Sequence, residues 1–506
     1  MATLTFAPPQ STGHPTASGP KPSPASANAG TRADRYAQTL IMTLLFAAPA
    51  ILCLHAGAVA DPDIWWHMRV GELILQNHHI LRTEPFSRGF AGTPWVVYSW
   101  LFELLMFKIY QWFGLMGILG YSTGMILAIT AAMYHMVRRL QADFIVSVLL
   151  TYAACYSFCH LYTPRPWMFS ILFFILELDI LMQARKTGRL RGLLWLPVIF
   201  ALWANIHIEF IYGLFLTGMV FLESLAANRR NGARDSLPVV PAACALVGSG
   251  LATLANPFGW RIYQVIYDLV TQGGGLKQVS EMQAIPFRDL PDYCVLALAL
   301  ASVAALAWSR RFRIFESGVL LFAIVMSFRE IRDIWLLCAV AAAVLASAIP
   351  ARKDSKVVRL PRFALALAIL GAIGILLLAP RVLKVDNAKL LSQVINTMPV
   401  HAVEAVREKG YPGPLFNEFD WGGYLIWSLR QPVAIDGRTN LYGNDGMDRS
   451  ITTWNGLPNW ATDPQLKSAR LIIGHVNSPL TQLLRLDSNY QLVYEDKIAA
   501  VFVVRN

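Results

Sequence analysis

The stretch AQTLIMTLLFAAPAILCLHAGAVADPDIWWHMRVGE (residues 37–72) decides how this chain folds. Residues 37–60 form an apolar run long enough to cross a bilayer, since a spanning helix needs about 20 such residues. Two aspartates, two tryptophans and a histidine follow at once. Because carboxylates are costly inside lipid and ordinary at its edge, this boundary places Asp61 and Asp63 where a membrane helix meets water.

The composition is that of a polytopic membrane protein. Of 506 residues, 55% are hydrophobic and only 15% are charged, and the mean hydropathy is +0.44, which excludes most soluble enzymes. The net charge of +11 comes from Lys and Arg gathered between apolar runs, so membrane orientation accounts for it and nucleic-acid binding is not indicated. The 6 cysteines lie in or beside apolar runs, which predicts small buried hydrophobic residues rather than disulfides.

Apolar runs predict an all-α membrane domain over residues 36–380, with about eleven transmembrane helices. The run at 99–113 is short and is interrupted by Glu103 and Lys108, so we expect a helix lying at the membrane interface. If that segment crossed the membrane instead, every later loop would change sides. The expected spans are residues 37–60, 115–136, 143–161, 167–183, 192–206, 210–227, 236–255, 292–308, 314–328, 333–350 and 363–380.

Basic residues occupy alternate loops between these runs, as the positive-inside rule requires. Their placement predicts a cytoplasmic N-terminus. Residues 1–35 are expected to be a disordered leader, because Pro, Ser, Ala, Thr and Gly dominate them and cannot bury a core. The motifs rich in Asp, Glu, His and Trp then share the opposite, non-cytoplasmic face. These motifs are DPDIWWH, TPRPW, NIHIEF, NPFGW through VSEMQ, and REIRD.

Residues 381–506 predict a small extracytoplasmic α/β domain. Helical periodicity over residues 388–410 gives way to four short β-rich runs bounded by turn residues: PVAIDGR, ARLIIGH, YQLVYED and AAVFVVR. A segment of this length is large enough to fold on its own. An odd number of spans after a cytoplasmic N-terminus places it outside.

The Asp61-Pro62-Asp63 corner is the first candidate for chemistry. Proline fixes its own φ and extends the residue before it. In an extended chain, Asp61 and Asp63 point to the same side and can converge on one hard cation or one reacting hydroxyl. Alternatively, Asp63 caps the helix that begins at Ile64 and Asp61 is a solvated loop charge. His67 lies one turn further on and faces either the same site or the lipid headgroups.

These residues resemble the GT-C superfamily of membrane glycosyltransferases, which place an acidic pair just outside the first transmembrane helix, before interfacial helices. The sequence also distantly resembles protein mannosyltransferases, which belong to this superfamily. Members use polyprenyl-phosphate-linked sugars on the non-cytoplasmic face, and the acidic pair carries the catalytic base, sometimes with a divalent cation such as Mg or Mn. The resemblance implies that Asp61 and Asp63 are catalytic. Before PFS, Glu84 stands where an aspartate would be expected.

Two later stretches resemble the catalytic subunit of oligosaccharyltransferase, one branch of that superfamily. QVSEMQ (278–283) is similar to its outer-loop Ser-Glu motif, which would place Glu281 with Asp61 and Asp63 around a metal, if one is used. FDWGGYLIW and IDGRTN resemble its Trp-Trp-Asp region, where the acceptor is recognised. The order here is Phe-Asp-Trp, so the acceptor's identity does not carry over. The residues nominated there are Asp420, Trp421, Gly422, Asp436 and Arg438.

Other polar residues on the same face fit a phosphate leaving group. Arginine suits bidentate phosphate contacts, which nominates Arg165, Arg329 and Arg332 with His67 for donor binding. Snorkelling, or pairing with neighbouring Glu330 and Asp333, is the alternative for the arginines. His207 and Glu209 lie where one span ends and the next begins, and we expect both in the cavity.

The leading hypothesis is therefore an inverting membrane glycosyltransferase of the bacterial inner membrane. Its donor would be a polyprenyl-phosphate-linked sugar, and its acceptor a hydroxyl on a lipid, glycan or protein. One alternative is a transporter or flippase of a lipid-linked glycan, which predicts polar residues at mid-membrane depth. A second alternative is a non-catalytic scaffold of the cell envelope, in which the two aspartates have no joint role.

Overall fold

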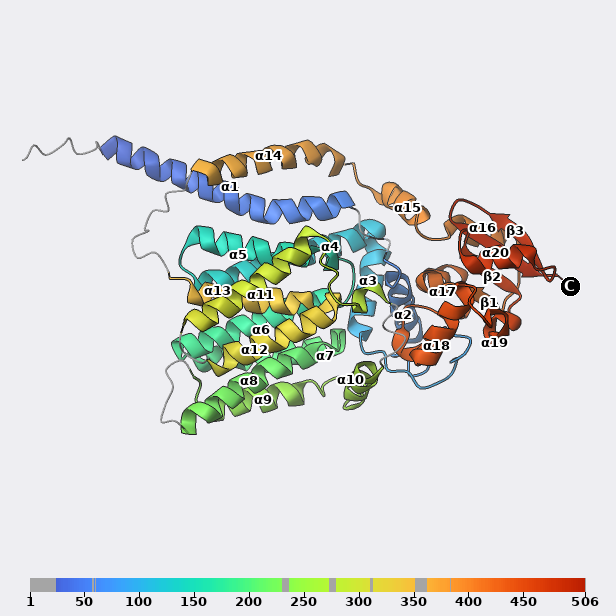
Figure 1. Cartoon of the computed structure of the whole chain (residues 1–506), viewed down its shortest axis with the longest axis horizontal. Helices are drawn as coiled ribbons and strands as arrows, with labels where there is room; N and C mark the ends of the chain where they lie inside the picture. Colours follow the sequence, from blue (N-terminus) through green and yellow to red (C-terminus); the bar gives the residue numbers. More distant parts are fainter. Residues whose placement is uncertain are drawn as a thin grey trace, which may run out of the picture.

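The computed structural model describes residues 24–56, 59, 61–229, 236–272, 279–309, 313–350, 362–382 and 384–505. Long helices run side by side in a bundle, and a smaller domain that contains the C-terminus stands at one end of it (Figure 1). The predicted fold class, a helical membrane domain followed by a small α/β domain, is confirmed.

The apolar runs expected to span the membrane all form helices. Within the described part of the chain, six of these helices are long and apolar enough to cross a membrane, whereas α5, α7, α9, α12 and the apolar stretch Ala368–Leu377 of α14 are shorter. The predicted number of spans therefore stays a prediction. The bundle helices are α1 (Pro24–Ala56), α4 (Leu115–Leu140), α5 (Phe144–Ser157), α6 (Trp167–Thr187), α7 (Leu196–Ile206), α8 (Phe210–Arg229), α9 (Val239–Ala252), α11 (Leu290–Trp308), α12 (Ile314–Arg329), α13 (Ile334–Ala348) and α14 (Arg362–Val382).

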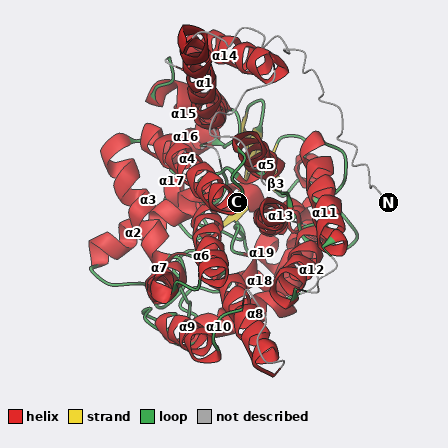
Figure 2. Cartoon of the chain, turned by 90° about the vertical axis from the view of Figure 1, so that its left-hand side faces the viewer, coloured by secondary structure: helices red, strands yellow, loops and turns green. Residues whose placement is uncertain are grey.

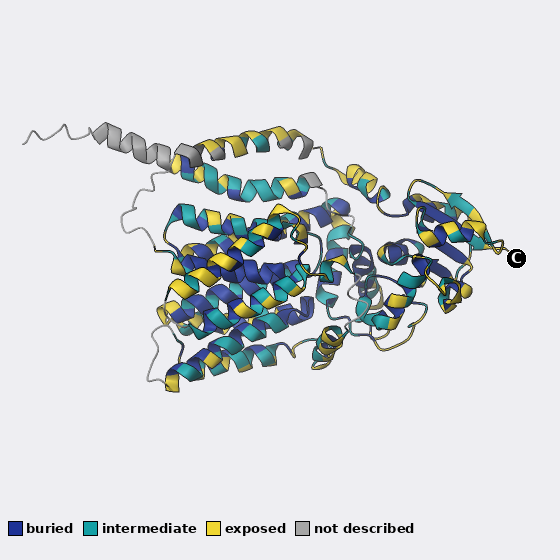
Figure 3. Ribbon diagram, in the orientation of Figure 1, coloured by how far each residue is buried: buried dark blue, intermediate teal, exposed yellow. Residues whose placement is uncertain are grey.

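Helix α13 forms the centre of the bundle. Every side chain from Ile334 to Ala346 is buried, and α4, α5, α11 and α12 pack around it (Figure 3). Its many alanines let the neighbouring backbones approach closely, as small residues do between membrane helices. At the end far from the C-terminal domain, Arg185 pairs with Glu223 at 2.7 Å and with Glu316 at 3.0 Å, which ties α6, α8 and α12 together.

Two short helices close the other end of the bundle. α2 (Ile64–Asn77) and α3 (Trp100–Phe113) pack on each other and run across the direction of the bundle helices (Figures 1 and 2). A Cβ atom on Gly71 would lie 2.2 Å from the Glu103 carbonyl oxygen, so only glycine allows this close crossing. With 14 residues, α3 is roughly 21 Å long. The interfacial position expected for residues 99–113 stays a prediction.

The C-terminal domain combines short helices with one sheet. The sheet has the order β1-β2-β4-β3, in which β1 and β2 are parallel and the other pairs antiparallel. Helix α10 (Arg261–Thr271) lies apart from it, after α9. The domain's elements are α15 (Asn387–Ile395), α16 (Val400–Lys409), β1 (Leu415–Asn417), α17 (Gly422–Leu429), α18 (Thr439–Trp454), α19 (Pro464–Lys467), β2 (Leu471–His475), α20 (Pro479–Leu486), β3 (Tyr490–Glu495) and β4 (Ala499–Val504).

One predicted strand is wrong. PVAIDGR (432–438) is a buried extended segment outside the sheet, and the unpredicted β1 takes the edge position beside β2. The Val433 N–H donates to the Phe86 carbonyl at 2.8 Å, and the Arg88 N–H donates to the Val433 carbonyl at 2.9 Å. Its backbone hydrogen bonds therefore join the C-terminal domain to the loop between α2 and α3.

The predicted leader needs a correction. α1 begins at Pro24, so residues 24–35 are helical rather than disordered. Residues 1–23 of the predicted leader lie outside the described residues.

Candidate active site

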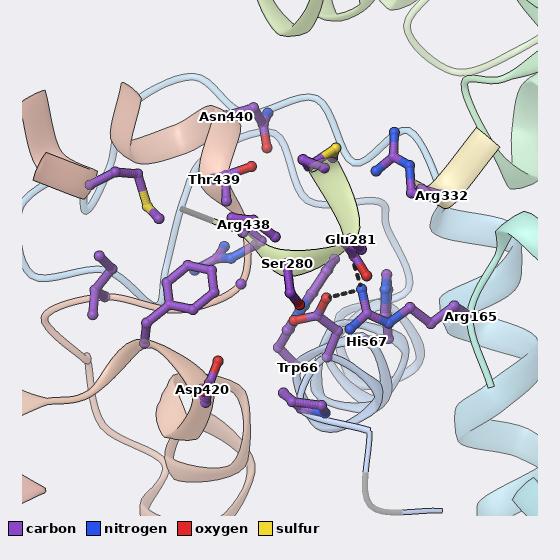
Figure 4. Close-up of a pocket in the computed structure, with 18 of the residues that line it drawn as sticks. Trp66, His67, Arg165, Ser280, Glu281, Arg332, Asp420, Arg438, Thr439 and Asn440 are labelled. Carbon is purple, nitrogen blue, oxygen red and sulfur yellow. Dashed lines mark hydrogen bonds and ion pairs between the residues drawn. The ribbon is translucent and has the colours of Figure 1, made fainter. Parts of the chain in front are cut away.

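A cavity of about 800 Å³ lies between the end of the bundle and the C-terminal domain. Its walls come from α2, from the loops that precede α6, α8 and α13, and from the C-terminal segments around Asp420 and Arg438 (Figure 4). Residues far apart in the sequence thus meet in one polar site. The sequence-predicted residues that line it are Asp63, His67, Arg165, His207, Glu281, Arg332, Asp420, Trp421 and Arg438.

The Asp-Pro-Asp corner is organised by Arg165. Arg165 Nε donates to Asp61 Oδ2 at 2.7 Å, and its Nη1 lies 2.8 Å from Asp63 Oδ2 and 3.2 Å from Glu281 Oε1. Asp61 and Asp63 therefore converge as expected, but through a turn rather than an extended chain, because Asp63 has φ −87° and ψ −24° and its N–H donates to Asp61 Oδ1 at 2.9 Å. The Asp63 side chain makes no capping hydrogen bond to α2, so the helix-cap alternative is wrong.

The three carboxylates expected to share a metal surround a guanidinium instead. Each of Asp61, Asp63 and Glu281 contacts Arg165. Among the residues that the structure describes, no group of three or more His, Cys, Asp or Glu side chains is placed to hold a metal ion. The arrangement does not fit a divalent cation.

Burial governs the protonation of this corner. Burial raises the pKa of Asp63 to about 6, against the attraction of the Arg165 charge. Burial alone would lower the pKa of Arg165, but Asp61, Asp63 and Glu281 together raise it. At neutral pH, Asp63 is therefore mostly a carboxylate and Arg165 is a cation.

The His67 ring is fixed by a contact with Glu103 of α3. Its Nδ1 lies 3.3 Å from Glu103 Oε1, and the Ser99 hydroxyl donates to the same oxygen at 3.0 Å. Burial, and then the positive charge of Arg165, hold the pKa of His67 well below its ordinary value, whereas burial raises the pKa of Glu103 to about 8. The imidazole that lines the cavity is thus neutral at pH 7.

Arg332 and His207 form the opposite wall on the bundle side. His207 Nδ1 lies 2.8 Å from Ser170 Oγ and 3.2 Å from Glu209 Oε2, while Arg332 Nε lies 3.7 Å from Glu209 Oε1. His207 and Arg332 outweigh burial and lower the pKa of Glu209. Arg332 Nε makes no hydrogen bond within the described chain. Arg332 also lines the cavity, so its positive charge lies where an anionic ligand would meet it.

Arg329 does not join this wall. Its side chain is 57% exposed and its Nε lies 3.2 Å from Glu330 Oε1, the alternative that the sequence left open. It is not among the residues that line the cavity.

Glycines of the C-terminal domain press against the Asp-Pro-Asp corner. A Cβ atom on Gly437 would lie 1.8 Å from Asp63 Oδ1, and one on Gly423 would lie 2.4 Å from the Pro62 carbonyl oxygen. A Cβ atom on Gly422 would meet the Ile435 carbonyl at 2.1 Å. The WGGY and DGR segments thus pack directly on the corner because they carry no side chain there.

The C-terminal wall of the cavity carries acid and aromatic groups. Asp420 faces the cavity, and burial raises its pKa, against the attraction of His475 and Arg165. The rings of Trp421 and His475 lie 3.8 Å apart, and Trp421 Nε1 donates to the Thr397 carbonyl at 3.0 Å. Asp420 is placed to meet a ligand, while Trp421 is fully buried and holds the wall in shape.

Asp436 and Arg438 form a buried ion pair rather than an open acceptor site. Arg438 Nε lies 2.7 Å from Asp436 Oδ1, Tyr442 donates to Asp436 Oδ2 at 2.6 Å, and Arg438 also pairs with Glu84. The guanidinium lies 4.9 Å from the centre of the Trp95 ring. Asp436 does not line the cavity, because its oxygens accept hydrogen bonds inside the protein, and its predicted acceptor role stays a prediction. Glu84 lies in this pair and not in the cavity.

Sequence reasoning missed three residues near the site. Glu103 was noted only as an interruption of an apolar run, although an ionisable residue in such a run is itself a signal. Glu418 and His475 pair at 3.3 Å behind Asp420, and burial raises the pKa of Glu418 to about 7. Their sequence surroundings carried no signal, because the two residues meet only when β1 and β2 pair.

Fold and site together define an integral membrane protein with a charged cavity at one end of its helical bundle. No protein-family model matches the chain, and no curated protein matches it. Its fold is similar to the crystal structure of ArnT from Cupriavidus metallidurans bound to undecaprenyl phosphate, with a TM-score of 0.47 and 13% identity over 91% of this chain and 97% of that chain. The apo state of that protein gives a TM-score of 0.39 and 12% identity over the same shares.

Proposed function

We propose that this protein is a membrane glycosyltransferase that moves a sugar from a polyprenyl-phosphate donor to an acceptor hydroxyl. One observation carries the proposal: the partly buried carboxylate of Asp63 and the guanidinium of Arg332 line the same cavity, where the apolar helices end. A carboxylate base that takes the acceptor's proton and a cation that stabilises the departing phosphate are the two groups that this transfer needs. The resemblance of the corner to GT-C enzymes points the same way.

Asp63 acts as the general base in this proposal. It takes the proton of the acceptor hydroxyl as the oxygen bonds to the anomeric carbon, and the lipid phosphate leaves with the electron pair of the broken bond. Arg332, which lines the same cavity, stabilises the charge on the departing phosphate. A single displacement of this kind inverts the anomeric centre, as the resemblance implies.

The cavity's position supports transfer over transport. A transporter of lipid-linked glycans needs its binding site near the membrane midplane, whereas this cavity is lined by loops at the end of the bundle and by segments of the C-terminal domain. Figure 1 shows that domain at the same end of the bundle. From the positive-inside pattern of the basic loops we infer that this end faces the extracytoplasmic side of a bacterial inner membrane. The donor would reach the cavity from the bilayer, and the acceptor would enter beside the C-terminal wall at Asp420.

The test is transfer of radiolabelled sugar from polyprenyl-phosphate donors by the purified protein in proteoliposomes. We expect Asp63→Asn to lower the rate by about 100-fold or more, the usual contribution of a general base. Asp268→Asn is the matched control, since Asp268 is exposed on α10 at the same end of the bundle. Equal rates for wild type and an Asp61→Asn, Asp63→Asn double variant would rule the proposal out.

A further inference from the structure

Arg165 is fixed from the bundle side, independently of the carboxylates that it binds. It stands between Pro164 and Pro166, which restrict the backbone on both sides. Its N–H donates to the Thr163 carbonyl at 2.7 Å, and its own carbonyl accepts from the Tyr121 hydroxyl at 3.2 Å. The guanidinium lies 4.7 Å from the centre of the Trp167 ring. The guanidinium is therefore a built-in part of the cavity.

Three carboxylates from two separate segments converge on this one cation. Asp61 and Asp63 come from the corner before α2, and Glu281 from the single-turn helix Ser280–Met282. Asp63 and Glu281 both contact Nη1. Figure 4 shows the Arg165 side chain reaching between α2 and the Glu281 turn.

We propose that the Arg165 guanidinium fills the cation position of this site, so that the protein works without a divalent ion and the three carboxylates can bind one only when Arg165 is removed. A hard cation needs carboxylate oxygens at about 2.0–2.6 Å. Those same oxygens are engaged by N–H donors of Arg165, whose positive charge repels a second cation. The effect on sugar transfer rests on the proposed function, but cation binding does not.

Direct binding of Mn²⁺, followed by electron paramagnetic resonance of the full-length protein in detergent, tests the proposal. We expect wild type to leave all added Mn²⁺ free, and Arg165→Ala to bind one ion per chain. Adding Asp61→Asn and Asp63→Asn to the Arg165→Ala chain should abolish that binding. Arg430→Ala is the control, because Arg430 pairs with the single carboxylate of Glu72 and its removal creates no cluster.

A second variant, Arg165→Gln, keeps the test valid if Arg165→Ala misfolds. Arg165→Gln removes the charge but keeps most of the side-chain volume, and it should also bind Mn²⁺. Stoichiometric Mn²⁺ binding by wild type that is lost in Asp63→Asn would overturn the proposal. So would the absence of binding in a monodisperse Arg165→Gln protein.

Sugar transfer provides a separate measurement. Wild-type transfer should change less than about twofold on addition of a chelator, and Arg165→Gln should lose about 100-fold, as when one charge-stabilising donor is removed. Mn²⁺ should restore part of that loss. If wild type transfers no sugar from any donor, the proposed function fails, whereas the Mn²⁺ result still decides the role of Arg165.

Discussion

Two arginines of this protein each bind several carboxylates, and they lie on opposite sides of one interface. Arg165 contacts three carboxylates, and its side chain is 15% exposed beside the cavity. Arg438 contacts Asp436 and Glu84 with its side chain only 3% exposed, among the rings of Trp66, Phe86 and Trp95. Both arginines border the cavity, but the Arg165 cluster is the more open of the two, whereas the Arg438 guanidinium is almost fully enclosed by carboxylates and aromatic rings.

The buried contacts of Arg438 with Asp436 and Glu84 should contribute most to the stability of the protein. Arg438→Met leaves Asp436 and Glu84 as uncompensated buried charges, and breaking a buried pair in this way costs about 3–5 kcal/mol. We expect a much lower unfolding temperature in detergent and rapid proteolysis of the C-terminal domain. Arg449→Met serves as the control, because Arg449 is 40% exposed and lies 3.8 Å from its partner Asp463. Unchanged thermal unfolding of Arg438→Met would break the comparison.

The packing between the two sides should be the next most sensitive feature. In Gly437→Ala, the new Cβ would overlap the Asp63 carboxylate, and a displacement of about 1 Å at a reacting group can cost about 100-fold in rate. We expect kcat for sugar transfer to fall by that order while the protein remains folded. Gly124→Ala is the matched control, since nothing lies within 4 Å of its Cβ position. Wild-type kcat in Gly437→Ala would show that Asp63 tolerates movement.

The protonation of Asp63 at the Arg165 site should be visible in the pH dependence of sugar transfer. Because the pKa of Asp63 is raised to about 6, its carboxylate is present above that pH and is lost as the pH falls through it. The kcat/KM of sugar transfer should therefore decline on the acid side of about pH 6, by about tenfold per pH unit. A profile of kcat/KM that stays flat to about pH 5 would identify a different base, such as neutral His67.

An exposed ion pair, Arg430 with Glu72, should contribute least to stability. Arg430 is 42% exposed and binds Glu72, which Arg69 also contacts at 2.7 Å. Surface pairs contribute about 0–1 kcal/mol, so Arg430→Ala should shift thermal unfolding only slightly and leave sugar transfer unchanged. A loss of stability as large as that of Arg438→Met would show that burial does not separate the two classes.

The local features of this protein were predictable because they depend on neighbours in the chain. Hydropathy marked every bundle helix, since the free energy of burying a segment in lipid is a property of that segment. The corner at Asp61-Pro62-Asp63 was expected to be extended, but Pro62 and Asp63 form a turn and Asp63 has φ −87° and ψ −24°. The segment PVAIDGR showed the limit of this reasoning, because its composition suits a strand but its hydrogen bonds go to the loop at Phe86 and Arg88.

The sequence alone thus determined the apolar helices and the presence of charged groups at one end of the bundle. Tertiary structure alone decided which charges meet: Asp61, Asp63 and Glu281 at Arg165, and Glu84 and Asp436 at Arg438. The physical reason is that an ion pair depends on distance and burial in space. Residues 354 positions apart, such as Glu84 and Arg438, are brought together only by the packing of two whole domains.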